Sequence, residues 1–156
     1  SIMVGARVDA GIAAEVGAMK VTEQIDAMRA LGASPIKKLV TPKILAGMIT
    51  LPLLTVTADI IGIFGGMIIA IFELEIDSTF YIDSVLTTVT ISDLLSGIGQ
   101  TVFFGALIAV IGCYFGFRTS GGTTGVGRST TVTVVTVSIM ILISDFFLTK
   151  LFLIIF

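Results

Sequence analysis

Two carboxylates lie inside long apolar segments of the sequence, where ionisable side chains are rare. Asp59 interrupts the apolar run of residues 44–72, and Asp145 lies within the last apolar run, residues 131–156. Because a charge is costly in hydrocarbon, such residues are functional candidates by default. If both runs are helices that start at the same membrane surface, both carboxylates lie about 21–22 Å along them. They could then face one cavity.

These polar residues also have a structural interpretation. A protonated Asp59 could form a hydrogen bond with Thr55, Thr57 or a neighbouring backbone group. The same holds for Asp145 and for Gln100, the other polar residue well inside an apolar run. We expect both carboxylates to be largely neutral and to hold helices together.

Two further charged residues, Arg7 and Glu15, interrupt the small apolar residues at positions 2–19. Charged side chains near the end of a membrane helix often extend to the interface, where they pair with one another. Snorkelling and pairing are therefore the simpler interpretation of Arg7 and Glu15, beside a role in a transport path.

Residues typical of catalytic centres are scarce. The chain has no histidine and a single cysteine, Cys113, which excludes a thiolate metal site and a histidine-assisted nucleophile. Residues 122–129 differ at one position from the phosphate-binding pattern G-x-x-x-x-G-K-[ST]. That loop needs a preceding strand and a lysine, whereas here an apolar run precedes it and Arg128 replaces the lysine. We therefore expect no enzyme activity, no metal site and no bound cofactor in this chain.

The composition indicates where these residues lie. Hydrophobic residues make up 55% of the 156 residues and charged residues 13%, and the mean hydropathy is +1.11. Such values are typical of an integral membrane protein. The net charge of -2 leaves no basic surface for nucleic acid.

The apolar runs predict an all-α integral membrane protein, a polytopic helical bundle with three full spans and a partial one. Each long run exceeds the roughly 20 residues that a helix needs to cross a bilayer. Gly112 and Gly116 are four residues apart, and Gly62 and Gly66 in the previous run have the same spacing, which favours close helix packing. The full spans are residues 44–72, 92–117 and 131–156, and the partial span is residues 2–19.

The basic residues predict the orientation. Residues 1–43 contain six Lys or Arg and the Gly/Ser/Thr-rich loop of residues 118–130 contains two, whereas residues 73–91 contain none. Positively charged loops stay in the cytoplasm. We therefore place residues 20–43 and the 118–130 loop in the cytoplasm and the acidic loop of residues 73–91 outside.

A short helix is predicted within the polar segment of residues 20–35. Acidic residues at its start suit the helix dipole, and Gly32 stands where a C-terminal cap belongs. Ile25, Met28 and Leu31 form a narrow apolar stripe at helical spacing. Nine or ten residues give about 15 Å of helix, too short to span a membrane. We expect a cytoplasmic helix that offers this face to a partner.

The sequence resembles the MlaE (YrbE) permeases, the membrane subunits of ABC transporters that work with MCE-domain proteins. The run RVDAGIAAEVGAM at residues 7–19 and TEQIDA at residues 22–27 are similar to the family signature. At residues 9–11, Asp-Ala-Gly stands where the family more often has Gly-Ser-Ala, which leaves the role of that stretch open. The likeness continues at residues 51–56, 59–62, 121–131 and 145–149.

The resemblance implies a function. Such permeases form homodimers in the bacterial inner membrane, or less often in the plastid inner envelope. They bind a cytoplasmic ABC ATPase, which holds ATP and Mg, and move phospholipid or another lipid with an MCE-domain protein outside. Family members are longer, so we expect residues 1–156 to form one transmembrane permease domain at the C-terminal part of a longer chain.

The resemblance also assigns residues. The short helix then is the coupling helix, which would sit in a groove of the ATPase. Its expected contacts are Glu23, Gln24, Ile25, Asp26, Met28 and Arg29.

The candidates for lipid-path or structural polar residues are Arg7, Glu15, Asp59, Gln100 and Asp145. Two alternatives stay open, a non-transporting scaffold that recruits a cytoplasmic partner and an ion-conducting pore that uses the two aspartates.

Overall fold

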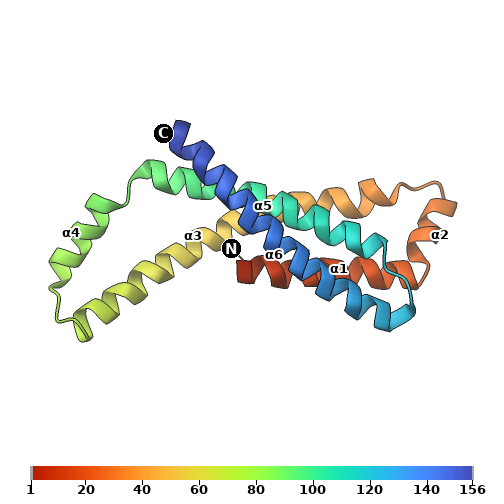
Figure 1. Ribbon diagram of the computed structural model, residues 1–156, viewed down its shortest axis with the longest axis horizontal. Coiled ribbons are helices and arrows are strands. Elements are labelled where there is room, and N and C mark those ends of the chain that lie inside the picture. The colour runs from red at the N-terminus through yellow and green to blue at the C-terminus, as the bar shows by residue number, and fades with distance from the viewer. Residues whose placement is uncertain (1, 156) are drawn as a thin grey trace.

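The computed structural model describes residues 2–155, apart from the side chains of residues 2, 92, 153 and 155. Every regular element in this part of the chain is helical, as predicted (Figure 1). In order, the elements are α1 (Ile2–Val21), α2 (Gln24–Ala30), the π-helical turn η1 (Ile36–Val40), α3 (Thr41–Phe72), α4 (Ser78–Thr88), α5 (Ile91–Phe117) and α6 (Gly122–Ile155).

Three helical segments are long and apolar enough to cross a membrane, which confirms the three predicted full spans. They are Ile36–Phe72, Asp93–Phe117 and Gly122–Phe152. The first of them contains Pro52 inside the helix. Helix α1 lies against α5 and α6, so its small residues pack among the spans.

Helices α1, α3, α5 and α6 form a packed bundle around a small apolar core. The core contains residues from three of these helices, and its members are Leu51, Phe104, Ile108, Val137 and Ile141. A second buried cluster lies between α1, α2 and α5, and it consists of Val16, Ile25 and Cys113. This second cluster joins the short helix α2 to the bundle.

Glycines allow the closest contacts between the helices. The backbones of α3 and α5 meet at Gly47 and Gly105, where a Cβ built on Gly47 would lie 2.6 Å from the Gly105 carbonyl oxygen. Helix α1 packs on Gly112 and Gly116, and a Cβ at Gly116 would lie 2.6 Å from the Val16 Cβ. Small residues permit such approaches in membranes.

The two pairs of glycines four residues apart have different neighbours. A Cβ at Gly62 would meet nothing within 4 Å, and one at Gly66 would lie 2.6 Å from the Tyr81 hydroxyl of α4. Gly112 and Gly116 instead face α1. The four-residue spacing identifies a face that permits close packing, but it does not identify the partner.

Two segments that we expected to be loops are largely helical. The acidic segment of residues 73–91 contains α4, and Thr90 caps α5 by a reciprocal pair of hydrogen bonds with Asp93. Helix α6 begins at Gly122, so most of the predicted 118–130 loop forms its first turns. The phosphate-loop pattern therefore lies on a helix and not in a loop.

Candidate coupling surface and polar residues of the spans

Helix α2 is held at one end of the bundle by sharp turns on both sides. Glu23 has a positive φ of 60°, and Gly32 has a φ of 73° just beyond the C-terminus of the helix. The Thr22 hydroxyl donates a hydrogen bond to the Ala18 carbonyl at 2.8 Å and so extends the end of α1. The helix has seven residues, shorter than the nine or ten expected.

The apolar stripe of α2 faces its own chain, contrary to our expectation that it faces a partner. Ile25 is fully buried against Val16 and Cys113, and Met28 packs on the same cluster. Only Leu31 of the stripe is exposed, with 86% of its surface accessible. The periodicity predicted the stripe correctly, but it could not tell which neighbour covers it.

The outward face of α2 is polar. Glu23, Gln24, Asp26 and Arg29 are all exposed. The Lys20 ammonium donates to the Asp26 carboxylate at 2.7 Å, and the Arg29 guanidinium lies 3.6 Å from the same group. The hydrogen bond from Lys20 is the main reason that the pKa of Asp26 falls below its ordinary value. Asp26 therefore stays ionised, and α2 carries a fixed charge pattern.

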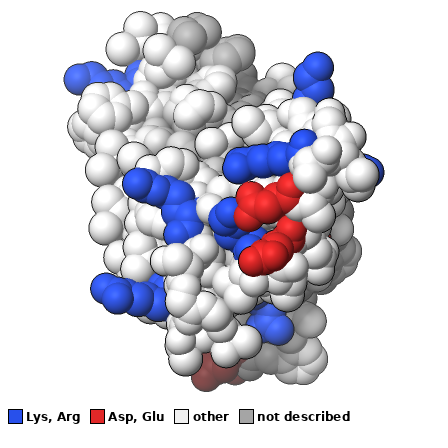
Figure 2. Space-filling model, turned by 90° about the vertical axis from the view of Figure 1, so that its right-hand side faces the viewer, with Lys and Arg blue, Asp and Glu red and all other residues white. Residues whose placement is uncertain are grey.

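Basic residues surround α2 at what we call the basic end of the molecule, where α2, η1 and the connection between α5 and α6 lie together (Figure 1). Figure 2 shows this end with basic side chains spread over it and acidic ones gathered in a smaller area. The basic residues on these elements and at the adjoining helix ends are Lys20, Arg29, Lys37, Lys38, Arg118 and Arg128.

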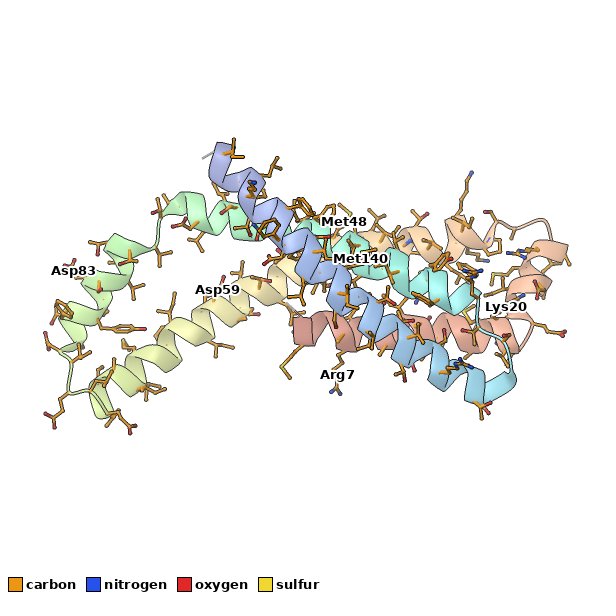
Figure 3. The ribbon with its side chains drawn as sticks, viewed as in Figure 1. Arg7, Lys20, Met48, Asp59, Asp83 and Met140 are labelled. Atoms are coloured by element: carbon orange, nitrogen blue, oxygen red, sulfur yellow. The ribbon has the colours of Figure 1, made fainter. Side chains whose placement is uncertain are left out.

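Arg7 and Glu15 do not pair with each other. The Lys43 ammonium at the start of α3 donates to the Glu15 carboxylate at 2.6 Å, which joins α1 to α3. Arg7 is exposed, lies in none of the ion pairs of the described residues and points away from the bundle (Figure 3). The pairing expected for Glu15 is therefore present, with Lys43 and not Arg7 as its partner.

The two aspartates of the spans are both exposed on the surface of the chain. Figure 3 places Asp59 on the part of α3 that diverges from the bundle. The hydroxyls of Thr55 and Thr57 donate to the Leu51 and Leu54 carbonyls and not to Asp59. The expected hydrogen bonds between these threonines and Asp59 are therefore absent, since each threonine is satisfied within its own helix.

Asp59 shares a cavity with a different carboxylate from the one we expected. An open, mainly apolar cavity of about 400 Å³ lies between α3 and the start of α5, and Asp59 and Asp93 both line it. Asp145 is not among its lining residues. Equal depth along two helices did not place the two side chains together, because α3 diverges from α5 and α6 in this region (Figure 1).

Gln100 and Asp9 complete the set of polar residues within the bundle. The Gln100 amide donates to the Thr149 hydroxyl at 3.4 Å and so links α5 to α6. Asp9 is fully buried between α1 and α5, and neither carboxylate oxygen has a hydrogen-bond partner among the described residues. Arg7 lies two residues away on the same helix, and residues at this spacing point to different sides. The only sign of this in the sequence was that Asp9 stands where the family more often has glycine.

The described residues contain no cluster of three or more metal-ligating side chains. Charged and polar groups lie mainly at the basic end and along α4, and long apolar helices join these regions. This arrangement defines a polytopic α-helical membrane protein whose short polar helix lies at the ends of the spans.

Comparison with known proteins gives the family. The model of the permease MlaE matches residues 1–151, and the chain belongs to this family. It is 44% identical over 150 residues to a probable ABC transporter permease protein of Rickettsia typhi, across 96% of this chain and 58% of that protein. A probable ABC transporter permease protein of Synechocystis is 40% identical over 95% of this chain and 56% of its own length.

A plant protein is also similar. The chloroplastic protein TRIGALACTOSYLDIACYLGLYCEROL 1 of Arabidopsis thaliana is 38% identical over 97% of this chain and 43% of its own length. The chain thus spans less than three fifths of the length of these three relatives.

Proposed function

We propose that this chain is part of the membrane subunit of an ABC-type transporter that moves lipid, in particular phospholipid, between membranes. ATP hydrolysis, with its ATP and Mg, belongs to a separate cytoplasmic ATPase subunit. The observation that carries the proposal is the placement of α2, whose inner side is anchored on the bundle and whose outer side is charged and exposed.

The anchoring of α2 suits it to transmit movement. Ile25 and Met28 pack with residues of α1, α5 and η1, so a displacement of α2 reaches three neighbouring elements. Interiors packed in this way transmit strain because they contain few voids. The ATPase would contact Glu23, Gln24, Asp26 and Arg29, and Leu31 adds an apolar contact. Ile25 holds α2 in place and is not available to a partner.

A lipid cargo fits the apolar surfaces of the spans. The cavity between α3 and α5 is largely apolar, and the Arabidopsis relative has the name of a galactolipid. The exposed apolar residues of α3 suit lipid or a second copy of the chain, which agrees with a homodimer. An MCE-domain protein would bind at the opposite end, near α4. We place the protein in the bacterial inner membrane, with the plastid inner envelope as the alternative suggested by the chloroplastic relative.

The test reverses the charge of the outer face of α2. In the intact permease, Glu23→Lys with Asp26→Lys should abolish co-purification with the ATPase and ATP-dependent lipid transfer after reconstitution. Because both side chains are exposed, circular dichroism and thermal unfolding should show an unchanged membrane fold. Lys20→Gln is the matched control, since it breaks the ion pair with Asp26 but leaves both carboxylates in place.

Each outcome identifies a different class of protein. Normal ATPase binding and transfer in the double variant would refute the coupling role of α2. A wild-type protein that binds the ATPase but moves no lipid would be a scaffold. Conductance without ATP would indicate the ion pore.

A further inference from the structure

A small cavity lies at the basic end, where α5 ends and α6 begins. Its volume is about 260 Å³, and two guanidinium groups, Arg118 and Arg128, line it. Apolar side chains of the two spans, Phe115 and Val132, form another part of its wall. The cavity is therefore bounded by cations and by the ends of two membrane helices.

The two arginines have no acidic partner in the described part of the chain. The ion pairs among the described residues involve Lys20, Arg29 and Lys43, and neither Arg118 nor Arg128. The sequence contains no Asp or Glu between Asp93 and Asp145, so the adjoining parts of α5 and α6 supply no counter-charge. Two unpaired positive charges around one cavity attract an anion.

The surrounding groups orient Arg118 and leave the arginines as the main side-chain donors. Arg118 donates to the Tyr114 hydroxyl, and its guanidinium carbon lies 5.3 Å from the centre of the Tyr114 ring. The hydroxyls of Thr119 and Ser129 both donate to the Phe115 carbonyl, at 3.1 and 3.0 Å. Their protons are thus committed within the protein.

The chemistry points to a phosphate group. Guanidinium groups bind phosphate through pairs of parallel hydrogen bonds, which gives geometric specificity as well as attraction. The cavity is too small for an element of another protein, and it lies at the ends of two candidate spans, where lipid headgroups would lie. Basic pockets between membrane helices are typical binding sites for anionic lipid headgroups.

We propose that Arg118 and Arg128 bind the phosphate of an anionic lipid at the basic end of the protein. This site is separate from the cavity between α3 and α5, and it does not depend on the direction of transport or on the cargo. A bound lipid would join the end of α5 to the start of α6 and fix the connection between them.

The experiment measures thermal unfolding of the delipidated, intact permease in detergent during titration with phosphatidylglycerol, phosphatidylcholine or inorganic phosphate. Phosphatidylglycerol should raise Tm of the wild type at the lowest concentration. Arg118→Gln with Arg128→Gln should weaken that response about tenfold in concentration. Lys37→Gln with Lys38→Gln removes the same charge from exposed residues outside the cavity and should leave the response unchanged.

A second variant separates a built site from general attraction. Arg118→Lys with Arg128→Lys keeps the charge but loses the paired hydrogen bonds, so it should lose most of the response. The proposal would be overturned if the lysine variant kept the full rise in Tm with phosphatidylglycerol, or if the Arg118/Arg128 and Lys37/Lys38 glutamine variants lost it equally. Either result would mean that the basic end attracts anionic lipid only through its overall charge. If inorganic phosphate raised Tm as much as phosphatidylglycerol does, the site would bind a soluble anion, and the proposal of a lipid ligand would be overturned. Loss of ATPase binding in the arginine variants alone, with the lipid response intact, would make the surface a protein contact.

Discussion

Long apolar helices run through both halves of this molecule, but the two halves are packed very differently. At the basic end and in the middle of the bundle, helices α1, α3, α5 and α6 bury the core and the cluster beneath α2. What we call the open half consists of residues 52–72 of α3, together with α4 and residues 91–98 of α5. There α3 diverges from the bundle (Figure 1), and Phe72 exposes 84% of its surface.

The glycines explain much of this difference. Gly47 and Gly105 bring α3 and α5 together, and Gly112 and Gly116 bring α5 against α1. In the open half, a Cβ on Gly62 or Gly65 would meet nothing within 4 Å. Small residues therefore produce close packing only where a second helix has a complementary surface. Gly62 and Gly65 leave an apolar face of α3 open to lipid or to a second copy of the chain.

The largest effect should come from filling the contact between α3 and α5. In Gly105→Val, the new Cβ would lie 2.9 Å from the Met48 backbone nitrogen and would also clash with Gly47. Backbone atoms cannot rotate away, so the free energy of unfolding should fall by about 3 kcal/mol. Gly62→Val in the open half should change it by no more than about 0.5 kcal/mol. Unfolding in detergent, followed by circular dichroism, measures both. Equal losses would contradict the contrast between the two regions.

Removing the buried carboxylate of α1 should change the free energy of unfolding by a smaller amount and in the opposite direction. Asp9 lies in the packed region with no hydrogen-bond partner among the described residues, and its Oδ1 would lie 2.5 Å from a Cβ on Gly112. A buried polar group without a hydrogen bond costs about 1–3 kcal/mol. Asp9→Ala should therefore raise the free energy of unfolding by about 1–2 kcal/mol in the same assay. Arg7→Ala, which changes an exposed neighbour, is the control and should have little effect. A destabilised Asp9→Ala would show that the carboxylate has a partner.

The contrast between the regions also explains what could be predicted from the sequence. The three spans depend on the length of apolar runs, which is a local property, and they were predicted correctly. The stripe of Ile25, Met28 and Leu31 was predicted too, but its partner was not. An apolar stripe indicates that one face of a helix will be buried, but it does not indicate which residues bury it. Here Val16 and Cys113, which cover Ile25, come from other helices.

The two missed helical segments have different causes. Helix α4 lies in an acidic segment whose polar residues suggested a loop, although Phe80 and Leu86 lie within the helix. The first turns of α6 contain three glycines, which weaken helices in water and so suggested a flexible turn. The wrong pairing of Asp59 with Asp145 has a third cause, because depth along a helix says nothing about how far neighbouring helices diverge.

The smallest effects should come from the two exposed aspartates. Asp59 and Asp145 have no hydrogen-bonded partner among the described residues, so a leucine leaves no group unpaired. Asp59→Leu and Asp145→Leu should each change the free energy of unfolding by no more than about 0.5 kcal/mol. A loss of about 1–3 kcal/mol would reveal a buried partner.

Lipid transfer by Asp59→Asn and Asp145→Asn then tests function, and we expect rates near that of the wild type. If Asp59→Asn alone abolishes transfer in a folded, ATPase-bound protein, an ionisable group acts in the lipid path, because Asp59 lines the cavity of the open half and Asp145 does not.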